Sequence, residues 1–384
     1  MLKTVVVFGT RPEAIKLAPV IKELEKYPDS FETVVCVTAQ HREMLDQVLN
    51  LFEIVPDYDL DIMQANQSLF DVTTRVLLGI KDVLEKENPD LVLVQGDTTT
   101  TFAASLASFY LKIPIGHVEA GLRTHDKYQP FPEEINRRVT SHIVDLHFAP
   151  TKRAKENLLS EGINEDGIFV TGNTAIDALH MTIKKLEKEP AKMQELNSRF
   201  PFLCSDSTKL LLVTGHRREN FGQGLENICY ALKEIVENNL DVVVVYPVHL
   251  NPNVRKPVMK ILGGIERISL VEPLEYDLFV ALMHKSYLVL TDSGGIQEEA
   301  PGLAKPVLVL RDTTERPEGI EAGTARLVGT NMEKIIIEVN RLLHDESEYL
   351  KMARVVNPYG AGKASKKIIE TLKQRRFSDI NGGL

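Results

Sequence analysis

A chain of 384 residues with 43% hydrophobic and 26% charged residues has the composition of an ordinary globular protein, which excludes a largely disordered or fibrous chain. The net charge of −9 argues against a general nucleic-acid or anionic-membrane surface, because such partners need a surface that replaces their counterions. A single hydrophobic core stops growing at about 250 to 300 residues, so the length favours two domains.

The N-terminal residues run directly into an apolar strand, without the basic region, long apolar stretch or cleavage site of a secretory signal. No apolar run in the sequence reaches the roughly 18 residues that a membrane span needs. Cys36, Cys204 and Cys229 are odd in number and far apart, which is typical of reduced thiols. We therefore expect a cytoplasmic protein that does not bind membranes.

In the first half of the chain, short apolar runs alternate with amphipathic segments. The expected strands cover residues 4–8, 33–37, 91–95, 113–118 and 147–149. This alternation predicts βα units and a parallel sheet. The near-continuous apolar character of the strands fits a sheet with helices on both faces.

The same alternation restarts after a polar, helix-prone stretch over residues 184–206. The expected strands of this second half cover residues 209–214, 241–246, 268–270, 287–291 and 306–310. We predict an α/β fold of two Rossmann-like, doubly wound parallel-sheet domains with a cleft between them. The N-terminal domain is expected over residues 1–170 with the C-terminal helix 363–384, and the C-terminal domain over residues 171–362. Ligands of such sheets bind beyond the carboxyl ends of the strands, where functional side chains are therefore expected.

The first polar cluster, GTRPEAIK, begins at Gly9 after the first strand and opens a helix. Free N–H groups at this helix start, together with Arg11 and Lys16, can bind an anion. A surface turn with solvated basic residues explains the pattern equally well. No G-x-G-x-x-G motif is present, so no dinucleotide site is predicted.

Three carboxylates follow at or near strand ends in the first half. Asp97 follows the strand 91–95, Glu119 ends the strand 113–118, and Glu133 opens a helix. Taken singly, Asp97 can be a helix cap and Glu133 can compensate a helix dipole. Carboxylates crowded in a shielded cleft raise the pKa of at least one of them, so together they indicate proton transfer.

The second half carries two histidines after strands. His216 has basic neighbours in the segment TGHRREN and can donate to a phosphate oxygen or move a proton, and His249 ends another strand in the same way. A loop histidine whose hydrogen bonds are satisfied within the protein is the alternative.

The strongest local pattern is the segment TDSGGIQEEAP at residues 291–301. Ser293, Gly294 and Gly295 form a turn into a helix, whose backbone N–H groups can cradle a phosphate. Glu299, one turn into that helix, can accept both hydroxyls of a ribose. Arg316, on a later loop, offers a further positive charge.

Templates for metal and nucleophile chemistry are missing from the sequence. It contains no H-E-x-x-H, paired C-x-x-C, G-x-S-x-G or P-loop motif. We predict no metal and no redox cofactor.

Ten segments in order along the chain resemble the bacterial non-hydrolysing UDP-N-acetylglucosamine 2-epimerases: FGTRPEAIKLAPV, VTAQHREMLDQV, GDTTTT, HVEAGLRT, FPEEINRR, GNTAIDAL, VTGHRREN, YPVHLNPNV, TDSGGIQEEAP and RDTTERPE. The resemblance implies the two-domain fold of one large glycosyltransferase class, called GT-B, and usually a homodimer. It further implies interconversion of UDP-N-acetylglucosamine and UDP-N-acetylmannosamine, which feeds surface polysaccharide synthesis. The implied route is anti elimination of UDP to 2-acetamidoglucal, followed by re-addition.

The resemblance also implies residue roles. Asp97, Glu119 and Glu133 are the candidate acids and bases, and His216 and Arg11 are expected to stabilise the diphosphate as it gains charge. The residues expected to hold UDP are Lys16, Phe279 near the uracil, Ser293, Gly294, Gly295, Glu299 and Arg316. Residues that in some relatives hold a second, activating UDP-N-acetylglucosamine correspond to Gln40, Arg217 and His249. Glu43 stands where those regulated relatives have glutamine, which is a departure from their pattern.

Three rival functions fit the same fold, because fold alone does not decide function. They are a GT-B glycosyltransferase, a hydrolysing 2-epimerase that releases UDP and free N-acetylmannosamine, and a nucleotide-sugar sensor without turnover. Three clustered carboxylates fit proton transfer better than the single base of a transferase.

Overall fold

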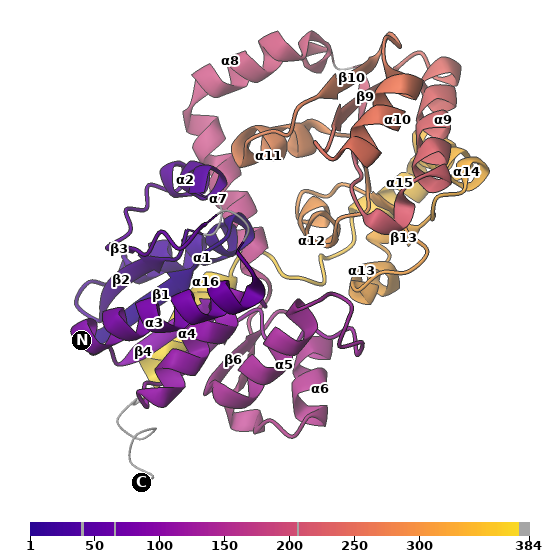
Figure 1. Cartoon of the computed structure of the whole chain (residues 1–384). Coiled ribbons are helices and arrows are strands. Elements are labelled where there is room, and N and C mark those ends of the chain that lie inside the picture. The colour runs from indigo at the N-terminus through magenta and orange to yellow at the C-terminus, as the bar shows by residue number, and fades with distance from the viewer. Residues whose placement is uncertain (40–41, 65–66, 206, 376–384) are drawn as a thin grey trace. The chain divides into compact units, whose positions relative to one another are not determined.

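The computed structural model describes residues 1–39, 42–64, 67–205 and 207–375 (Figure 1). The chain divides into two compact units. Unit 1 contains Met1–Ala178 and Tyr359–Leu384, and unit 2 contains Leu179–Pro358. None of the helices in the described part of the chain combines the length and apolar character needed to cross a membrane.

Unit 1 is built on a parallel sheet of seven described strands in the order β3-β2-β1-β4-β5-β6-β7. The strands are β1 (Leu2–Phe8), β2 (Phe31–Val37), β3 (Tyr58–Asp59), β4 (Leu91–Gln95), β5 (Ile115–Val118), β6 (Leu146–Ala149) and β7 (Ile168–Val170). The helices are α1 (Arg11–Leu24), α2 (Arg42–Leu51), α3 (Leu69–Glu87), α4 (Thr99–Tyr110), α5 (Glu133–Ile143), α6 (Lys152–Ser160), the start of α7 (Thr174–Lys188) and α16 (Ala364–Gln374). This strand order is that of a doubly wound fold.

Unit 2 repeats the architecture with six described strands in the order β10-β9-β8-β11-β12-β13, all parallel. The strands are β8 (Lys209–Thr214), β9 (Val242–Pro247), β10 (Ile268–Val271), β11 (Leu288–Thr291), β12 (Val307–Val309) and β13 (Ala325–Leu327). The helices, besides the end of α7, are α8 (Pro190–Arg199), α9 (Gln223–Asn238), α10 (Pro252–Leu262), α11 (Tyr276–Lys285), α12 (Gly294–Gly302), α13 (Pro317–Ala322), α14 (Met332–His344) and α15 (Glu346–Ala353).

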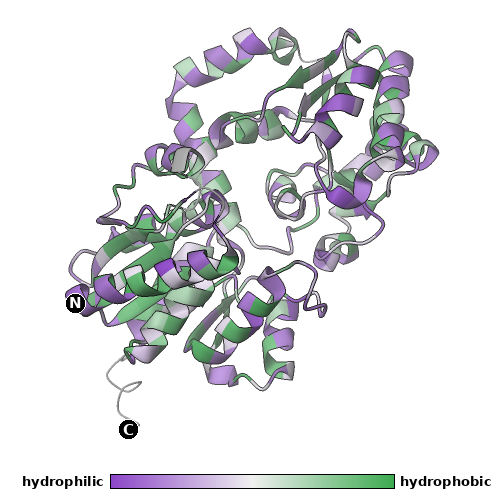
Figure 2. Cartoon of the chain, viewed as in Figure 1, coloured by the Kyte–Doolittle hydropathy of each residue, from purple (hydrophilic) through white to green (hydrophobic). Residues whose placement is uncertain are grey.

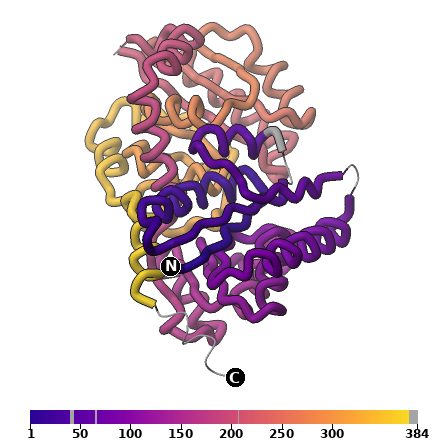
Figure 3. The backbone as a smooth tube through the Cα atoms, turned by 90° about the vertical axis from the view of Figure 1, so that its left-hand side faces the viewer, coloured from indigo at the N-terminus to yellow at the C-terminus, as the bar shows by residue number. Residues whose placement is uncertain are grey.

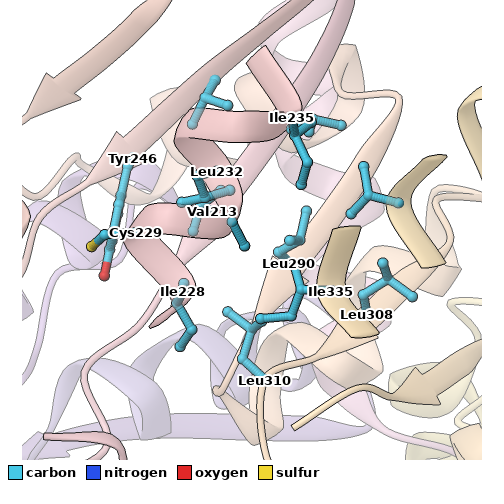
Figure 4. Packing of buried hydrophobic residues seen from close by; sticks show 14 of the residues in the cluster. Val213, Ile228, Cys229, Leu232, Ile235, Tyr246, Leu290, Leu308, Leu310 and Ile335 are labelled. Carbon is cyan, nitrogen blue, oxygen red and sulfur yellow. The ribbon is translucent and has the colours of Figure 1, made fainter. Parts of the chain in front are cut away.

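Each sheet forms the centre of its unit's core. The strands are almost uniformly apolar, whereas the helices carry an apolar and a polar face (Figure 2). In unit 2, Val213 of β8 and Leu290 of β11 pack with Leu232 and Ile235 of α9 and with Ile335 of α14, all fully buried (Figure 4). Burial of such side chains contributes roughly 1.5 to 3 kcal/mol each. The cores therefore hold the strand ends, and the loops that follow them, in fixed positions.

The predicted fold class is confirmed, and the predicted strands lie within one or two residues of the observed ones. The short strands β3, β7 and β13, of two or three residues each, were not predicted. The polar stretch between the two halves forms the end of α7 and the helix α8, which begins at Pro190. The C-terminal helix α16 packs against α1 of unit 1, although the two are far apart in sequence (Figure 3).

Candidate functional site

In unit 1 the strand order changes direction between β1 and β4, which is where ligands of doubly wound sheets bind. Arg11 opens α1 after β1, Asp97 follows β4, and Glu119 follows β5. The structure therefore places these predicted residues at the carboxyl ends of three adjacent strands.

The turn between β1 and α1 is organised by Glu13, a residue that the sequence reasoning did not single out. Its buried carboxylate accepts hydrogen bonds from the N–H groups of Gly9 at 3.0 Å and Thr10 at 2.8 Å. It also accepts from the hydroxyls of Thr98 at 2.6 Å and Thr101 at 3.1 Å. Burial raises the pKa of Glu13, and the hydrogen bonds from Thr98, Thr10 and Gly9 oppose that effect. The N–H groups of Gly9 and Thr10, which precede the helix, therefore already donate to Glu13.

Asp97 is held by helix α5. Its Oδ2 accepts from the guanidinium of Arg137 at 2.5 Å, and its carbonyl oxygen accepts from the side-chain amide of Asn136 at 3.0 Å. The cap of the following helix α4 is Thr98, whose hydroxyl accepts from the N–H of Thr101 at 3.1 Å. Asp97 therefore does not cap α4. Its side chain pairs with Arg137 of α5 instead.

Glu119 is buried and its backbone is in the left-handed region, with φ of +67°. That conformation costs a non-glycine residue roughly 1 to 2 kcal/mol. Its carboxylate accepts from the ammonium of Lys16, from the amide of Gln95, and from the amide of Asn173 at 3.2 Å. Lys16, predicted to hold UDP, is therefore the charge partner of Glu119 within unit 1.

Glu133 is the first residue of α5 and lies one turn before the two residues that hold Asp97. Its Oε2 is buried and has no hydrogen-bond partner among the described residues. Glu133 lines a cavity of about 400 Å³ together with Thr10, Thr98 and Asn136. A carboxylate oxygen without a partner beside a cavity is available to a ligand.

In unit 2 the strand order changes direction between β8 and β11. His216 follows β8, and Asp292 and Ser293 follow β11. The buried Oδ2 of Asp292 accepts from the N–H groups of His216 and Arg217, both at 2.8 Å. Asp292 therefore determines the shape of the loop that carries His216. Burial lowers the pKa of His216, and the negative charge of Asp292 partly opposes this effect.

Three arginines near these loops of unit 2, namely Arg217, Arg311 and Arg316, form ion pairs with glutamates. Arg316, predicted to bind UDP, donates from Nε to the buried Glu298. Glu315 accepts from Arg311 at 2.5 Å and from Arg217 at 3.0 Å. Burial raises the pKa of Glu315, but the positive charges of Arg311 and Arg316 outweigh burial and bring the pKa to about 2. These arginines are fixed in place before any ligand binds.

The two glycines in the turn from β11 into α12 differ in the space around them. A Cβ atom on Gly294 would lie 3.3 Å from Oε1 of Glu315, so a larger residue requires a small shift of that carboxylate. Gly295 has more space, since its nearest neighbour would be Oε1 of Glu299 at 3.8 Å. Ser293 is the N-cap position of α12, and Phe279 lies half-buried on α11.

His249 is exposed and its ring stacks on that of His216, with centroids 5.7 Å apart and an interplanar angle of 20°. Arg217 lies beside His216 in the chain. The third predicted residue of the second ligand site, Gln40, lies outside the described residues, and the same holds for the side chain of Glu43.

Several partners of the predicted residues were missed by the sequence reasoning. They are Glu13, Gln95, Asn136, Arg137, Asn173, Asp292, Glu298, Arg311 and Glu315. A sequence signal existed for two of them. Glu13 lies three residues after Thr10, the spacing of a capping box, and Asp292 directly follows an apolar strand.

Residues 22–373 match the family model described as UDP-N-acetylglucosamine 2-epimerase. The UDP-N-acetylglucosamine 2-epimerase of Salmonella typhimurium is 59% identical over 377 residues, which cover 98% of this chain and 100% of that protein.

Solved structures show the same similarity. The UDP-GlcNAc 2-epimerase from Neisseria meningitidis bound to UDP-GlcNAc superposes with a TM-score of 0.90 at 56% identity, covering 97% of this chain and 100% of that chain. The Methanocaldococcus jannaschii UDP-GlcNAc 2-epimerase in complex with UDP-GlcNAc and UDP gives a TM-score of 0.80 at 38% identity, with coverage of 97% and 100%.

Proposed function

Because this chain belongs to the UDP-N-acetylglucosamine 2-epimerase family, we propose that it interconverts UDP-N-acetylglucosamine and UDP-N-acetylmannosamine by inverting C2. The observation that carries the proposal is the 59% identity over 377 residues to a protein of that name. Relatives are also bound to UDP-GlcNAc or to UDP-GlcNAc and UDP in their solved structures. The side chains at the two switch points are of the types that this chemistry needs.

The proposed route follows from the low acidity of the C2 proton. C2 has no adjacent carbonyl group, so its proton leaves only if the electron pair of the C–H bond can expel UDP from C1. The first step therefore breaks the C2–H and C1–O bonds, forms the C1–C2 double bond of 2-acetamidoglucal, and leaves UDP bound. Return of a proton to the opposite face of C2 and of UDP to C1 gives the epimer.

In unit 1 the proposed acids and bases are Asp97, Glu119 and Glu133. Proton transfer by a positioned carboxylate contributes about 10² to 10⁴ in rate. The unpartnered oxygen of Glu133 beside its cavity and the pairing of Asp97 with Arg137 support this role. Lys16, paired with Glu119, and Arg11 add positive charge at the same strand ends.

In unit 2 the proposed role is binding of UDP. Ser293, Gly294 and Gly295 at the start of α12 are proposed to hold the diphosphate, and Glu299 the ribose. His216 is proposed to stabilise the charge that develops on UDP as it leaves. Preorganised groups are effective in this role because they need no rearrangement during the reaction, and the hydrogen bonds of Asp292 fix the backbone of His216 in this way.

We further propose that the enzyme is non-hydrolysing, so that UDP returns to the sugar. Proton NMR of the purified protein with UDP-N-acetylglucosamine in deuterated water tests this. The expected result is UDP-N-acetylmannosamine with deuterium at C2. Free UDP with N-acetylmannosamine would favour a hydrolysing epimerase, and an unchanged spectrum would redirect attention to a transferase or a sensor.

Four finer expectations belong to the same proposal: a homodimer, a cytoplasmic location, a role in surface polysaccharide synthesis, and activation by a second substrate molecule. The stacking of His249 on His216, with Arg217 beside them in the chain, supports the last of these. Activation predicts a sigmoidal dependence of rate on UDP-N-acetylglucosamine, which becomes hyperbolic in His249→Ala.

A further inference from the structure

The two oxygens of Asp292 have different environments. Oδ2 accepts from the N–H groups of His216 and Arg217 at 2.8 Å each and from the side-chain amide of Asn220 at 3.2 Å. Oδ1 is buried, accepts no hydrogen bond from any described residue, and lies 3.3 Å from Nδ1 of His216. The loop after β8 thus satisfies one oxygen and leaves the other facing the imidazole.

This contact favours one of the two neutral tautomers of the His216 ring. A neutral imidazole has one N–H group and one nitrogen lone pair. A carboxylate oxygen repels a lone pair and attracts an N–H group, and a buried carboxylate oxygen without a partner is costly. The 3.3 Å separation therefore favours the tautomer with the proton on Nδ1 of His216, which leaves the lone pair of the neutral ring on Nε2.

The charged or titratable groups that face the ring come from three loops. They are Asp292 after β11, His249 after β9, and Arg217 in the loop of His216 itself. Burial lowers the pKa of His216, Asp292 opposes this, and the charges of Arg217 and His249 lower it further. The net effect lowers the pKa of His216 below its usual value of about 6.5, which favours the neutral ring at pH 7 and above.

We propose that Asp292 is a positioning residue that holds His216 in the Nδ1–H form, so that binding of a diphosphate takes up one proton at Nε2. A phosphate oxygen cannot accept from a nitrogen lone pair, so the contact forms only when Nε2 gains a proton from the solvent. The resulting imidazolium donates to the phosphate from Nε2 and to Asp292 from Nδ1. This inference rests on the proposed role of His216 in UDP binding and adds a proton to that step.

Calorimetric titration of the full-length protein with UDP at pH 8, in buffers of different ionisation enthalpy, measures the proton uptake. Free UDP is fully ionised at this pH, because the second pKa of a phosphate is about 6. The unchanged protein is expected to take up about one proton per UDP. Asp292→Asn is expected to take up almost none, because the amide oxygen can keep the loop hydrogen bonds while the amide N–H group faces Nδ1 and shifts the ring proton to Nε2.

A matched control is Asp241→Asn, which makes the same change immediately before β9, at the amino end of the strands, where Asp241 pairs with Lys209 at 3.4 Å. This variant is expected to keep the proton uptake of the unchanged protein. UDP binding without proton uptake in the unchanged protein overturns this inference alone, whereas absence of UDP binding to the unchanged protein overturns the proposed function as well.

Nitrogen-15 NMR of the histidines in the ligand-free, unchanged protein is an independent measurement that needs no variant to fold. Protonation of His216 at Nδ1 is expected. A resonance pattern of the Nε2–H form would overturn the inference, whatever the result of the titrations.

Discussion

Arg137 donates a hydrogen bond to Oδ2 of Asp97 at 2.5 Å, and its side chain is only 9% exposed. This pair joins helix α5 to the loop after β4, so the direction of the proposed catalytic carboxylate depends on a residue 40 positions later. Hydrogen bonds to charged groups contribute roughly 1.5 to 3 kcal/mol when they are shielded from water.

Arg137→Met is therefore expected to lower kcat/KM for epimerisation by about 10- to 100-fold, which corresponds to about 1.4 to 2.7 kcal/mol. Loss of the guanidinium leaves Asp97 without its described charge partner and free to turn. The rate of deuterium incorporation at C2 measures the effect. The neighbouring Arg138→Met is the control, because Arg138 is 44% exposed and lies 3.4 Å from Glu161. Equal rates for the two variants would contradict a positioning role for Arg137.

The adjacent residues Glu133 and Glu134 are expected to separate activity from stability. Glu133→Gln keeps the shape of a side chain whose Oε2 has no described partner, but it removes the ability to exchange a proton. Deuterium exchange at C2 is expected to fall by about 100-fold or more. UDP binding, measured by calorimetry, is expected to change little.

Glu134→Gln is instead expected to lower the free energy of unfolding. The buried carboxylate of Glu134 accepts from the N–H groups of Thr124 and His125, both at 3.1 Å. Glutamine offers only one acceptor oxygen, so one of these two part-buried N–H groups loses its acceptor, at a cost of about 1 kcal/mol. Urea unfolding measures this loss. If Glu133→Gln proves the less stable variant, the roles assigned to the two residues are wrong.

The charge of Glu13 is expected to contribute less to the stability of the folded protein than its hydrogen bonds do. Burial raises the pKa of Glu13, so the neutral form is disfavoured less than at an exposed site. In Glu13→Gln the amide oxygen can accept from Gly9 and Thr10, while the hydroxyls of Thr98 and Thr101 can turn to accept from the amide N–H group. The free energy of unfolding should stay within about 1 kcal/mol of the unchanged value.

Glu13→Ala leaves these donors without an acceptor and is expected to cost about 2 to 4 kcal/mol. Urea unfolding of both variants gives the comparison. Losses of similar size in the two variants would show that the charge itself stabilises the turn.

The sequence was sufficient to predict the two sheets and the positions that follow their strands. Apolar runs such as residues 4–8 and 91–95 are local signals, and parallel sheets bring the carboxyl ends of their strands to one edge. Asp97, Glu119 and His216 could therefore be predicted at these ends from the strand pattern.

The partners of those side chains could not be predicted in the same way. Lys16 pairs with Glu119 across 103 residues of sequence, and Arg316 pairs with Glu298. Each predicted cation had several acidic residues in its vicinity along the chain, and only the packing of the loops selects between them. The strand β13 was missed for a similar reason. It is ordered by its pairing with β12, and that pairing cannot be read from the three residues of β13 themselves.

Two buried histidines are expected to make stability depend on pH. His117 and His147 are register partners on β5 and β6, and burial lowers the pKa of His117 to about 4 and that of His147 to about 3. In the unfolded chain both have a pKa of about 6.5. Between about pH 6.5 and pH 4 the unfolded chain therefore binds protons that the folded protein does not, and the free energy of unfolding falls as the pH falls.

Each of these histidines is expected to contribute up to about 1.4 kcal/mol of this loss per pH unit within that window and nothing above it. Urea unfolding at pH 7.5, 6 and 5 measures the dependence. His147→Asn removes one titrating group, so its stability should fall less steeply with decreasing pH than that of the unchanged protein. The same substitution at the exposed His344 is the control and should leave the slope unchanged. A slope in His147→Asn equal to that of the control would mean that carboxylates, and not the buried histidine, cause the loss of stability in acid.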